Sequence, residues 1–214
     1  MALEIHGMAL SAPCRIAYMT CELLGLEYKM VECDLMNGGN KTPEYLKMNP
    51  QHTIPCLKDG DFCLNESRVI ATYLINKHGK DDKLYPKDTV TRAMVDQRLY
   101  FDMGTFYKAF GECTYPILFG GPKPGQDKVD RFAEVMGWVN DFVKTSGYVA
   151  GTDHLTVADV AFVATYATIV AAGHLDLTPY VEVNAWFEKV KAQVPNYEKA
   201  CGQGAAAFGG WFKP

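Results

Sequence analysis

A serine that could stabilise an anionic sulfur lies near the N-terminus of the chain. Ser11 opens the segment Ser11-Ala12-Pro13-Cys14-Arg15, just before a helical pattern. A serine cannot form a disulfide with Cys14, so dithiol exchange is not expected here. Its hydroxyl can donate a hydrogen bond to a thiolate, and the positive end of the helix dipole adds to that stabilisation. The alternative role for Ser11 is that of an ordinary helix N-cap.

A second segment could bind an extended peptide backbone. Pro55 ends the run Asn49-Pro50-Gln51-His52-Thr53-Ile54-Pro55 and falls where a strand should begin. A cis peptide bond at Pro55 would leave the N–H and C=O of Ile54 free to pair with a ligand as a short added strand. The alternative is a trans proline that opens an edge strand.

A third segment, Glu66-Ser67-Arg68, begins another helical pattern and offers partners for charged ligand ends. The N–H of Ser67 suits a carboxylate at a helix N-terminus, Glu66 an α-amino group, and Arg68 a carboxylate. By itself this segment is an ordinary capped helix start. The three segments together match a ligand with a thiol, an extended backbone, an amine and carboxylates, and glutathione is such a ligand.

A small α/β unit must position these segments. Hydrophobic periodicity and turn residues predict strands at 2–8, 28–35, 54–58 and 62–64, and helices at 13–24, 43–48 and 67–78. The order βαβ, short helix, ββα, with a functional group at the first loop, is typical of a thioredoxin-like domain. We therefore predict an α/β thioredoxin-like N-terminal domain over 1–79 and a linker over 80–89.

Only helical patterns follow the linker, so an all-α domain is predicted over 90–214. The patterns cover 91–111, 128–145, 156–172 and 183–193. Thr156 and Asp159 resemble a capping box at the start of the third pattern.

Composition excludes several classes of function. The 21 basic and 25 acidic residues give a net charge of −4, which argues against nucleic-acid binding. No stretch of about 20 apolar residues predicts a membrane span, and the N-terminus does not resemble a signal peptide. The seven cysteines include no C-x-x-C pair, which argues against a zinc ribbon or a dithiol redox motif and fits reduced thiols in a cytoplasmic protein, and no metal is expected.

The motifs together resemble those of cytosolic glutathione S-transferases over essentially the whole chain. The three segments above resemble the delta class, or the delta/epsilon group. So do Gln97-Arg98-Leu99-Tyr100-Phe101-Asp102-Met103-Gly104-Thr105 and Leu155-Thr156-Val157-Ala158-Asp159. The resemblance implies an enzyme that conjugates the glutathione thiolate to hydrophobic electrophiles, assembled as a homodimer. Peroxidase activity toward organic hydroperoxides stays open.

The resemblance also implies which residues form the glutathione site. Ser11 would stabilise the thiolate, and glutathione would be bound by Asn40, His52, Thr53, Ile54, Pro55, Glu66, Ser67, Arg68 and Asp102. Asp102 would approach the γ-glutamyl end from the partner subunit. Asn40 is a departure, because the family often has a histidine near the glycyl end at this place.

The pocket for the electrophile would lie between the two domains. The positions matching it are Ala12, Pro13, Leu35, Tyr107, Phe110, Tyr115, Leu118 and Phe119. The tail aromatics Phe208 and Trp211 could form a lid over it. The alternative is that an aromatic stripe at helical spacing, and Phe110 in particular, belongs to the core.

Two further readings of the same residues stay open. Cys14 could be the nucleophile of a glutathione-dependent thiol transferase or dehydroascorbate reductase. The fold could also serve as a binding protein for hydrophobic compounds without turnover.

Overall fold

Four short strands form one mixed sheet in the first part of the chain. The computed structural model describes residues 3–212. The strands are β1 (Leu3–Gly7), β2 (Tyr28–Glu32), β3 (Cys56–Asp59) and β4 (Phe62–Asn65). Their order in the sheet is β2-β1-β3-β4, with β1 parallel to β2 and the other pairs antiparallel. Three helices accompany them: α1 (Ala12–Leu24), α2 (Pro43–Met48) and α3 (Ser67–His78).

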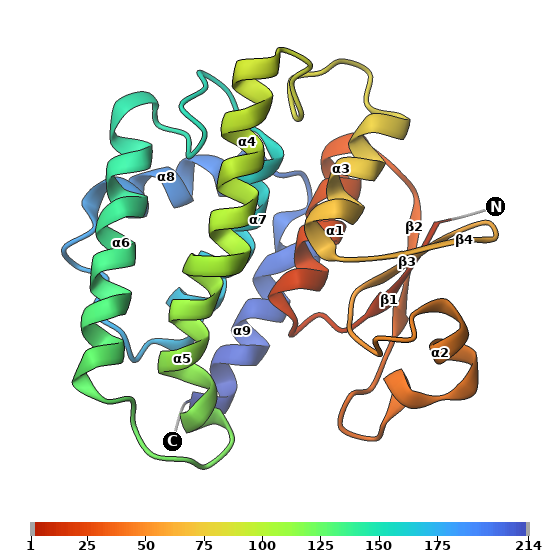
Figure 1. Cartoon of the computed structure of the whole chain (residues 1–214), viewed down its shortest axis with the longest axis horizontal. Coiled ribbons are helices and arrows are strands. Elements are labelled where there is room, and N and C mark those ends of the chain that lie inside the picture. Colours follow the sequence, from red (N-terminus) through yellow and green to blue (C-terminus); the bar gives the residue numbers. More distant parts are fainter. Residues whose placement is uncertain (1–2, 213–214) are drawn as a thin grey trace.

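Helices make up the rest of the described chain, and no strand follows Asn65 within residues 3–212. They are α4 (Thr89–Phe101), α5 (Tyr107–Leu118), α6 (Gln126–Ser146), α7 (Val157–Ala172), α8 (Val181–Lys191) and α9 (Gln203–Gly209). Figure 1 shows the sheet and α2 at one side and this helical part at the other. The predicted fold class, a thioredoxin-like unit followed by a helical domain, is confirmed.

The predicted helical pattern over 91–111 is confirmed, with one irregularity. The helices α4 and α5 are joined without a break by a π-helical turn over Asp102–Phe106. The helix α5 also continues past Gly111 and through Pro116. Gly111 lies inside α5, where a Cβ would lie 3.0 Å from the Tyr115 ring.

Two helices carry the core shared by both parts of the chain. Along α1, every residue from Cys14 to Cys21 is buried, and α1 packs against both α3 and α7. Along α7, all residues from Val157 to Ile169 are buried. The predicted capping box at the start of α7 is confirmed, with the Asp159 carboxylate accepting from the N–H and hydroxyl of Thr156.

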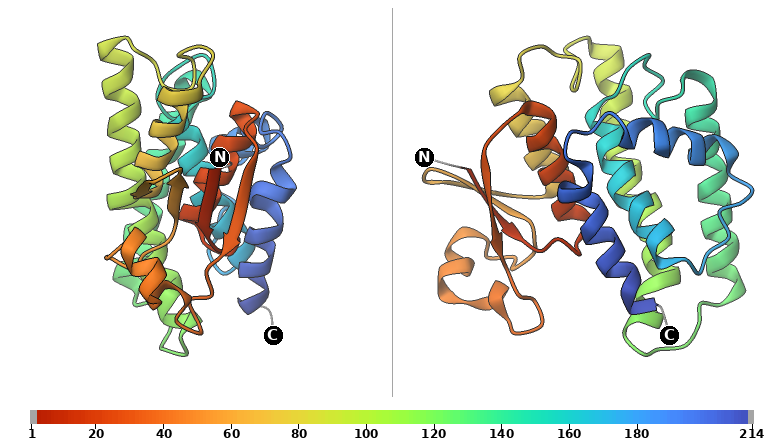
Figure 2. Two further views of the ribbon diagram at one scale, coloured as in Figure 1. Left: turned by 90° about the vertical axis from the view of Figure 1, so that its right-hand side faces the viewer. Right: turned by 180° about the vertical axis from the view of Figure 1, so that it is seen from behind.

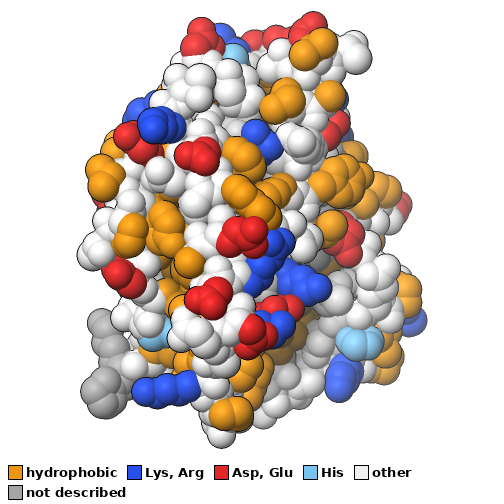
Figure 3. Space-filling view, turned by 60° about the vertical axis from the view of Figure 1, so that its left-hand side comes forward, with side chains coloured by type: hydrophobic (Ala, Val, Ile, Leu, Met, Phe, Trp, Pro, Cys, Tyr) orange, Lys and Arg blue, Asp and Glu red, His pale blue; other side chains and the backbone are white. Residues whose placement is uncertain are grey.

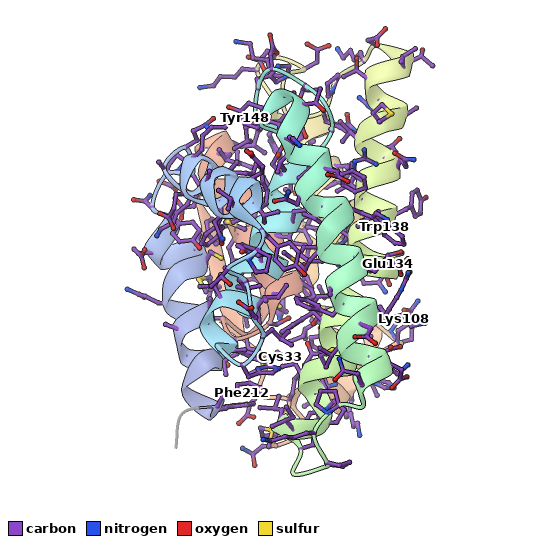
Figure 4. All side chains as sticks on the ribbon, turned by 90° about the vertical axis from the view of Figure 1, so that its left-hand side faces the viewer. Cys33, Lys108, Glu134, Trp138, Tyr148 and Phe212 are labelled. Atoms are coloured by element: carbon purple, nitrogen blue, oxygen red, sulfur yellow. The ribbon has the colours of Figure 1, made fainter. Side chains whose placement is uncertain are left out.

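The C-terminal helix α9 is part of this core. It packs on α7, and the right-hand view of Figure 2 shows it between α1 and α7. Phe208 is buried at 5% exposure. Phe212, labelled in Figure 4, stacks on His174 with ring centroids 5.2 Å apart. The prediction of a lid is therefore wrong for Phe208, because its ring is needed inside the core, while Trp211 remains half exposed.

A close backbone approach fixes α9 against the first loop. A Cβ on Gly204 would lie 2.1 Å from the carbonyl oxygen of Ala9, which precedes Ser11 by two residues. No real side chain tolerates that distance, so either α9 or the loop would have to move.

We expect Gly204→Ala to lower the free energy of unfolding by about 1–3 kcal/mol, because overpacking displaces backbone at this contact. Urea unfolding followed by circular dichroism measures it. The matched control is Gly210→Ala, since a Cβ there meets no atom within 4 Å. Equal stability of the two variants would contradict the packing argument.

Candidate active site

Ser11 stands at the N-cap position of α1, but its side chain does not cap the helix. Its backbone is extended (φ −76°, ψ 116°), and no hydrogen bond runs from its side chain to the first-turn N–H groups. The predicted alternative, a side-chain N-cap, is therefore wrong. Ser11 is half-buried at the start of the helix, and its side chain lies beside the Cys14 thiol.

Cys14 is placed where it cannot act as a nucleophile. Its side chain is fully buried, and burial raises the pKa of its thiol to about 11. A Cβ on Gly7 would lie 2.5 Å from the Cys14 sulfur, which shows how tightly the strand covers it. Cys14 is thus a protonated core residue at neutral pH, and the thiol-transferase reading loses its nucleophile.

The loop before β3 presents Ile54 outside the sheet. The Ile54–Pro55 peptide bond is cis, as predicted. The ladder begins one residue after Pro55, where Cys56 pairs with His6 and Asn65, so Ile54 is not part of it. A ligand backbone can reach Ile54 at this edge.

Side chains from α2 and its neighbours hold that loop in place. Tyr45 donates its hydroxyl to the carbonyl of Thr53 (2.6 Å), and the Asn49 amide donates to the same oxygen (2.8 Å). The Asn40 amide donates to the carbonyl of His52 (2.6 Å). Asn40 therefore braces this loop, and its predicted contact with glutathione stays a prediction.

Two of the three non-glycine residues with positive φ in the described chain lie at this site. They are His52 (φ 49°) and Glu66 (φ 69°), and the third is Asn196. Such conformations cost about 1–3 kcal/mol each and persist only where the surroundings enforce them. The two strained residues flank the edge where Ile54 is presented.

The start of α3 carries a buried ionic network. The Arg68 guanidinium donates from Nε to Oδ2 of Asp102 (3.0 Å) and from Nη1 to the hydroxyl of Ser67 (3.0 Å). The other oxygen of Asp102 accepts from the hydroxyl of Thr165 (2.8 Å). Asp102 thus ties α3 to α7 through Arg68.

This network corrects one expectation. The Asp102 side chain is fully buried, and both of its oxygens are bonded within its own chain. It therefore has no exposed oxygen with which to reach a site on a partner subunit. Glu66, by contrast, is exposed beside this network.

The residues predicted to line the acceptor pocket fall into two groups: an aromatic wall that is partly accessible, and buried rings that pack behind it. Tyr107 and Tyr115 share a hydrogen bond between their hydroxyls, and the Tyr115 ring stacks on Phe119. Phe110 is fully buried and touches Tyr107, Tyr115 and Phe208. The expectation that Phe110 and Phe208 line the pocket is thus replaced by a core role, because neither is accessible to a ligand.

The remaining predicted contacts vary in exposure. Ala12 is buried and Pro13 half-buried at the start of α1, Leu118 is half-buried, and Leu35 lies exposed on the loop after β2.

Sequence reasoning missed the supporting residues Tyr45, Asn49 and Thr165. Asn49 belongs to a motif that the sequence makes conspicuous, but its role as a loop brace is visible only in three dimensions. Tyr45 and Thr165 carry no local signal, because each acts on a segment distant in the sequence.

Within residues 3–212, no group of three or more His, Cys, Asp or Glu side chains is arranged to hold a metal ion. No helix in the same range is long and apolar enough to cross a bilayer.

We expect Asp102→Asn to lower the free energy of unfolding by about 2–3 kcal/mol, because it leaves the buried Arg68 charge without its partner. Chemical denaturation measures the change. Thr165→Val, which removes only the neutral donor to Asp102, should cost about 1 kcal/mol. An Asp102→Asn protein as stable as the parent would show that the ion pair contributes nothing.

Comparisons with known proteins agree with this geometry. The family described as "Glutathione S-transferase, N-terminal domain" matches residues 5–82. A delta-class glutathione transferase from Nilaparvata lugens is 45% identical, with 98% of each chain covered and a TM-score of 0.94. An epsilon-class enzyme from Musca domestica is 35% identical over 98% of this chain and 96% of that one, with a TM-score of 0.91.

A third solved structure, a glutathione transferase homologue from Drosophila mojavensis, contains bound glutathione. It is 35% identical, with 99% of this chain and 96% of that one covered, and its TM-score is 0.89. Because these similarities extend over nearly the whole length, the chain belongs to the glutathione transferase family, closest in character to its delta and epsilon classes.

Proposed function

We propose that this transferase conjugates glutathione to hydrophobic electrophiles and that Ser11 stabilises the reacting thiolate. One observation carries the proposal: Ser11 stands at the start of α1, and its hydroxyl makes no capping hydrogen bond. The positive end of the helix dipole points at the same place. The neighbouring Cys14 is buried and protonated, which leaves the ligand's own sulfur as the nucleophile.

The energetics of thiolate stabilisation are modest. A free thiol has a pKa near 8.5, and lowering it by two units requires about 2.7 kcal/mol. One charge-assisted hydrogen bond contributes about 1.5–3 kcal/mol and a helix N-terminus about 0.3–1 kcal/mol. Ser11 and α1 together are sufficient for a shift of this size.

Glutathione would lie along the edge formed by the three loops. Its cysteinyl backbone would pair with Ile54, and its glycyl end would extend toward His52 on the braced loop and Lys41 before α2, both of which are exposed. Its γ-glutamyl end would meet the N–H of Ser67 at the start of α3 and the exposed Glu66. This path explains why the loop bearing Ile54 is held by three separate side chains.

The electrophile would contact the accessible part of the aromatic wall. Tyr107 and Tyr115 are half-buried, whereas Phe119 is 77% exposed. Aromatic surfaces of this kind favour apolar ligands with few fixed polar contacts. We therefore assign hydrophobic electrophiles as the substrate class and the cytoplasm, where glutathione stays reduced, as the location.

Ser11→Ala should raise the pKa of the bound glutathione thiol toward that of the free thiol. With a shift of two units, turnover at pH 6.5 should fall roughly 50-fold, because the thiolate fraction falls by that factor. Ultraviolet titration of the bound thiolate and steady-state kinetics measure both effects. Glutathione affinity should change little.

Ser11→Thr, which keeps a hydroxyl at the site, serves as the matched variant. It should retain a lowered thiol pKa. If Ser11→Ala turns over as fast as the parent, Ser11 does not have the role assigned to it. If bound glutathione shows no thiolate in the parent either, the site binds without activating.

The same region carries an exposed apolar face that suits a second copy of the chain. A cavity of about 450 Å³ lies beside the α3 start and is lined in part by Val69, Tyr100 and Met103. These three side chains are 49%, 72% and 44% exposed. Figure 3 looks onto the side formed by α4, α5 and α6 and shows hydrophobic side chains between acidic and basic ones. We assign this face of α3 and α4 to a homodimer interface.

The variant Val69→Glu/Tyr100→Glu should be monomeric, because it places two like charges in each copy of the buried face. Sedimentation velocity at micromolar concentration measures the mass. Val181→Glu, at an exposed position of α8 away from that cavity, is the control and should stay dimeric. If the parent is monomeric, or if the double variant keeps the mass of the parent dimer, this face is not the dimer interface.

A further inference from the structure

One buried cation in the first turn of α1 has no anionic partner among residues 3–212. Arg15 is fully buried, four residues after Ser11. Buried charges are ordinarily paired, because taking an ion out of water costs several kcal/mol. A cation at the N-terminal end of a helix is also opposed by the helix dipole. The structure keeps a charge at a place where two physical effects disfavour it.

Every acceptor that Arg15 uses is neutral. Nη1 donates to the carbonyl oxygens of Ala9 (2.9 Å) and Leu10 (2.8 Å), the two residues before Ser11. Nη2 donates to the carbonyl of Ala164 (3.2 Å) and to the hydroxyl of Thr168, both on α7. Nε is buried without any hydrogen-bond partner. The guanidinium thus joins the Ser11 loop to α7 while its charge stays uncompensated.

The titratable groups around Arg15 do not supply a negative charge. Those influenced by its charge come from α1, α5 and the C-terminal segment: Cys14, Tyr18, Tyr107, Tyr115, Tyr197 and Cys201. Burial raises the pKa of each of them, so all are neutral near pH 7. The contrast with Arg68 is direct, because Arg68 has its carboxylate in Asp102.

We propose that Arg15 is a positioning residue whose unpaired charge acts on the glutathione thiolate through the Ser11 loop. The thiolate is the anion that the buried guanidinium lacks in the free protein. Binding of the anionic sulfur at the start of α1 supplies a compensating charge, so Arg15 favours the thiolate over the thiol. The proposal rests on the proposed function, since it needs a thiolate at Ser11.

The charge can be neutralised without removing Arg15. Thr168 is almost fully buried at Nη2 of Arg15, and aspartate is close to threonine in size. Thr168→Asp would place a carboxylate against the guanidinium and leave its bonds to Ala9 and Leu10 intact. Thr168→Asn is the matched control, because it makes a similar change in shape without the charge.

We expect the pKa of the glutathione thiol bound to Thr168→Asp to rise by about one unit relative to Thr168→Asn, at the lower end of the effect of a nearby charge. Turnover below the thiol pKa should then fall about tenfold. At pH 9, where either protein holds the thiolate, turnover should be equal. A purely structural role for Arg15 would lower stability in both variants without this pH dependence.

Arg15→Gln and Arg15→Lys provide a second pair that decides the question if Thr168→Asp does not fold. The glutamine variant, which removes the charge, should show the raised thiol pKa, and the lysine variant should keep most of the lowered one. Equal thiol pKa values in the charged and neutral members of the pair would overturn the role of Arg15.

The parent protein separates this result from the proposed function. If the parent lowers the thiol pKa but Thr168→Asp and Thr168→Asn do not differ, the role proposed for Arg15 is refuted and the role of Ser11 stands. If the thiol bound to the parent titrates like free glutathione, both proposed roles are refuted.

Discussion

The burial of α1 on both of its sides is the constraint on which the rest of the structure depends. The helix packs on the sheet unit through α3 and on the helical part through α7, and eight consecutive residues from Cys14 to Cys21 are buried. An amphipathic helix would have one face for a core and one for water. Here both faces of one helix are buried in the core that the two parts of the chain share, so packing from both parts fixes the position of its first residue. Ser11 is the residue that this arrangement holds still.

Electrostatics at the site follow from which charges are paired. Arg68 is paired with Asp102 inside the chain, and this pair joins α3 to α7. Arg15 has only neutral acceptors and therefore retains its field. The positive φ angles of His52 and Glu66 indicate that stability is given up at this site for function, because relaxed backbone conformations there would be more stable. The site is maintained by packing elsewhere in the molecule.

Much of the fold could be predicted because local signals were strong. The helix over 67–78 was predicted with the bounds that the structure shows, and the capping box of Thr156 and Asp159 marked the start of α7. The π-helical turn that begins at Asp102 could not be predicted, because the Asp102 side chain bonds to Arg68 and Thr165, which are distant from it in the sequence. The packing of the tail was missed for the same reason, because the contact of Gly204 with Ala9 joins residues distant in the sequence.

The contact between Gly204 and Ala9 also bears on how the protein is made. The loop before Ser11 leaves the ribosome early, but the helix that closes over it is encoded 195 residues later. At typical rates of synthesis that interval is roughly 10–40 seconds. During that time the nascent chain can form its sheet while the carbonyl of Ala9 and the buried faces of α1 lack their cover. The loop before Ser11 can therefore take its final packed position only after α9 has been synthesised.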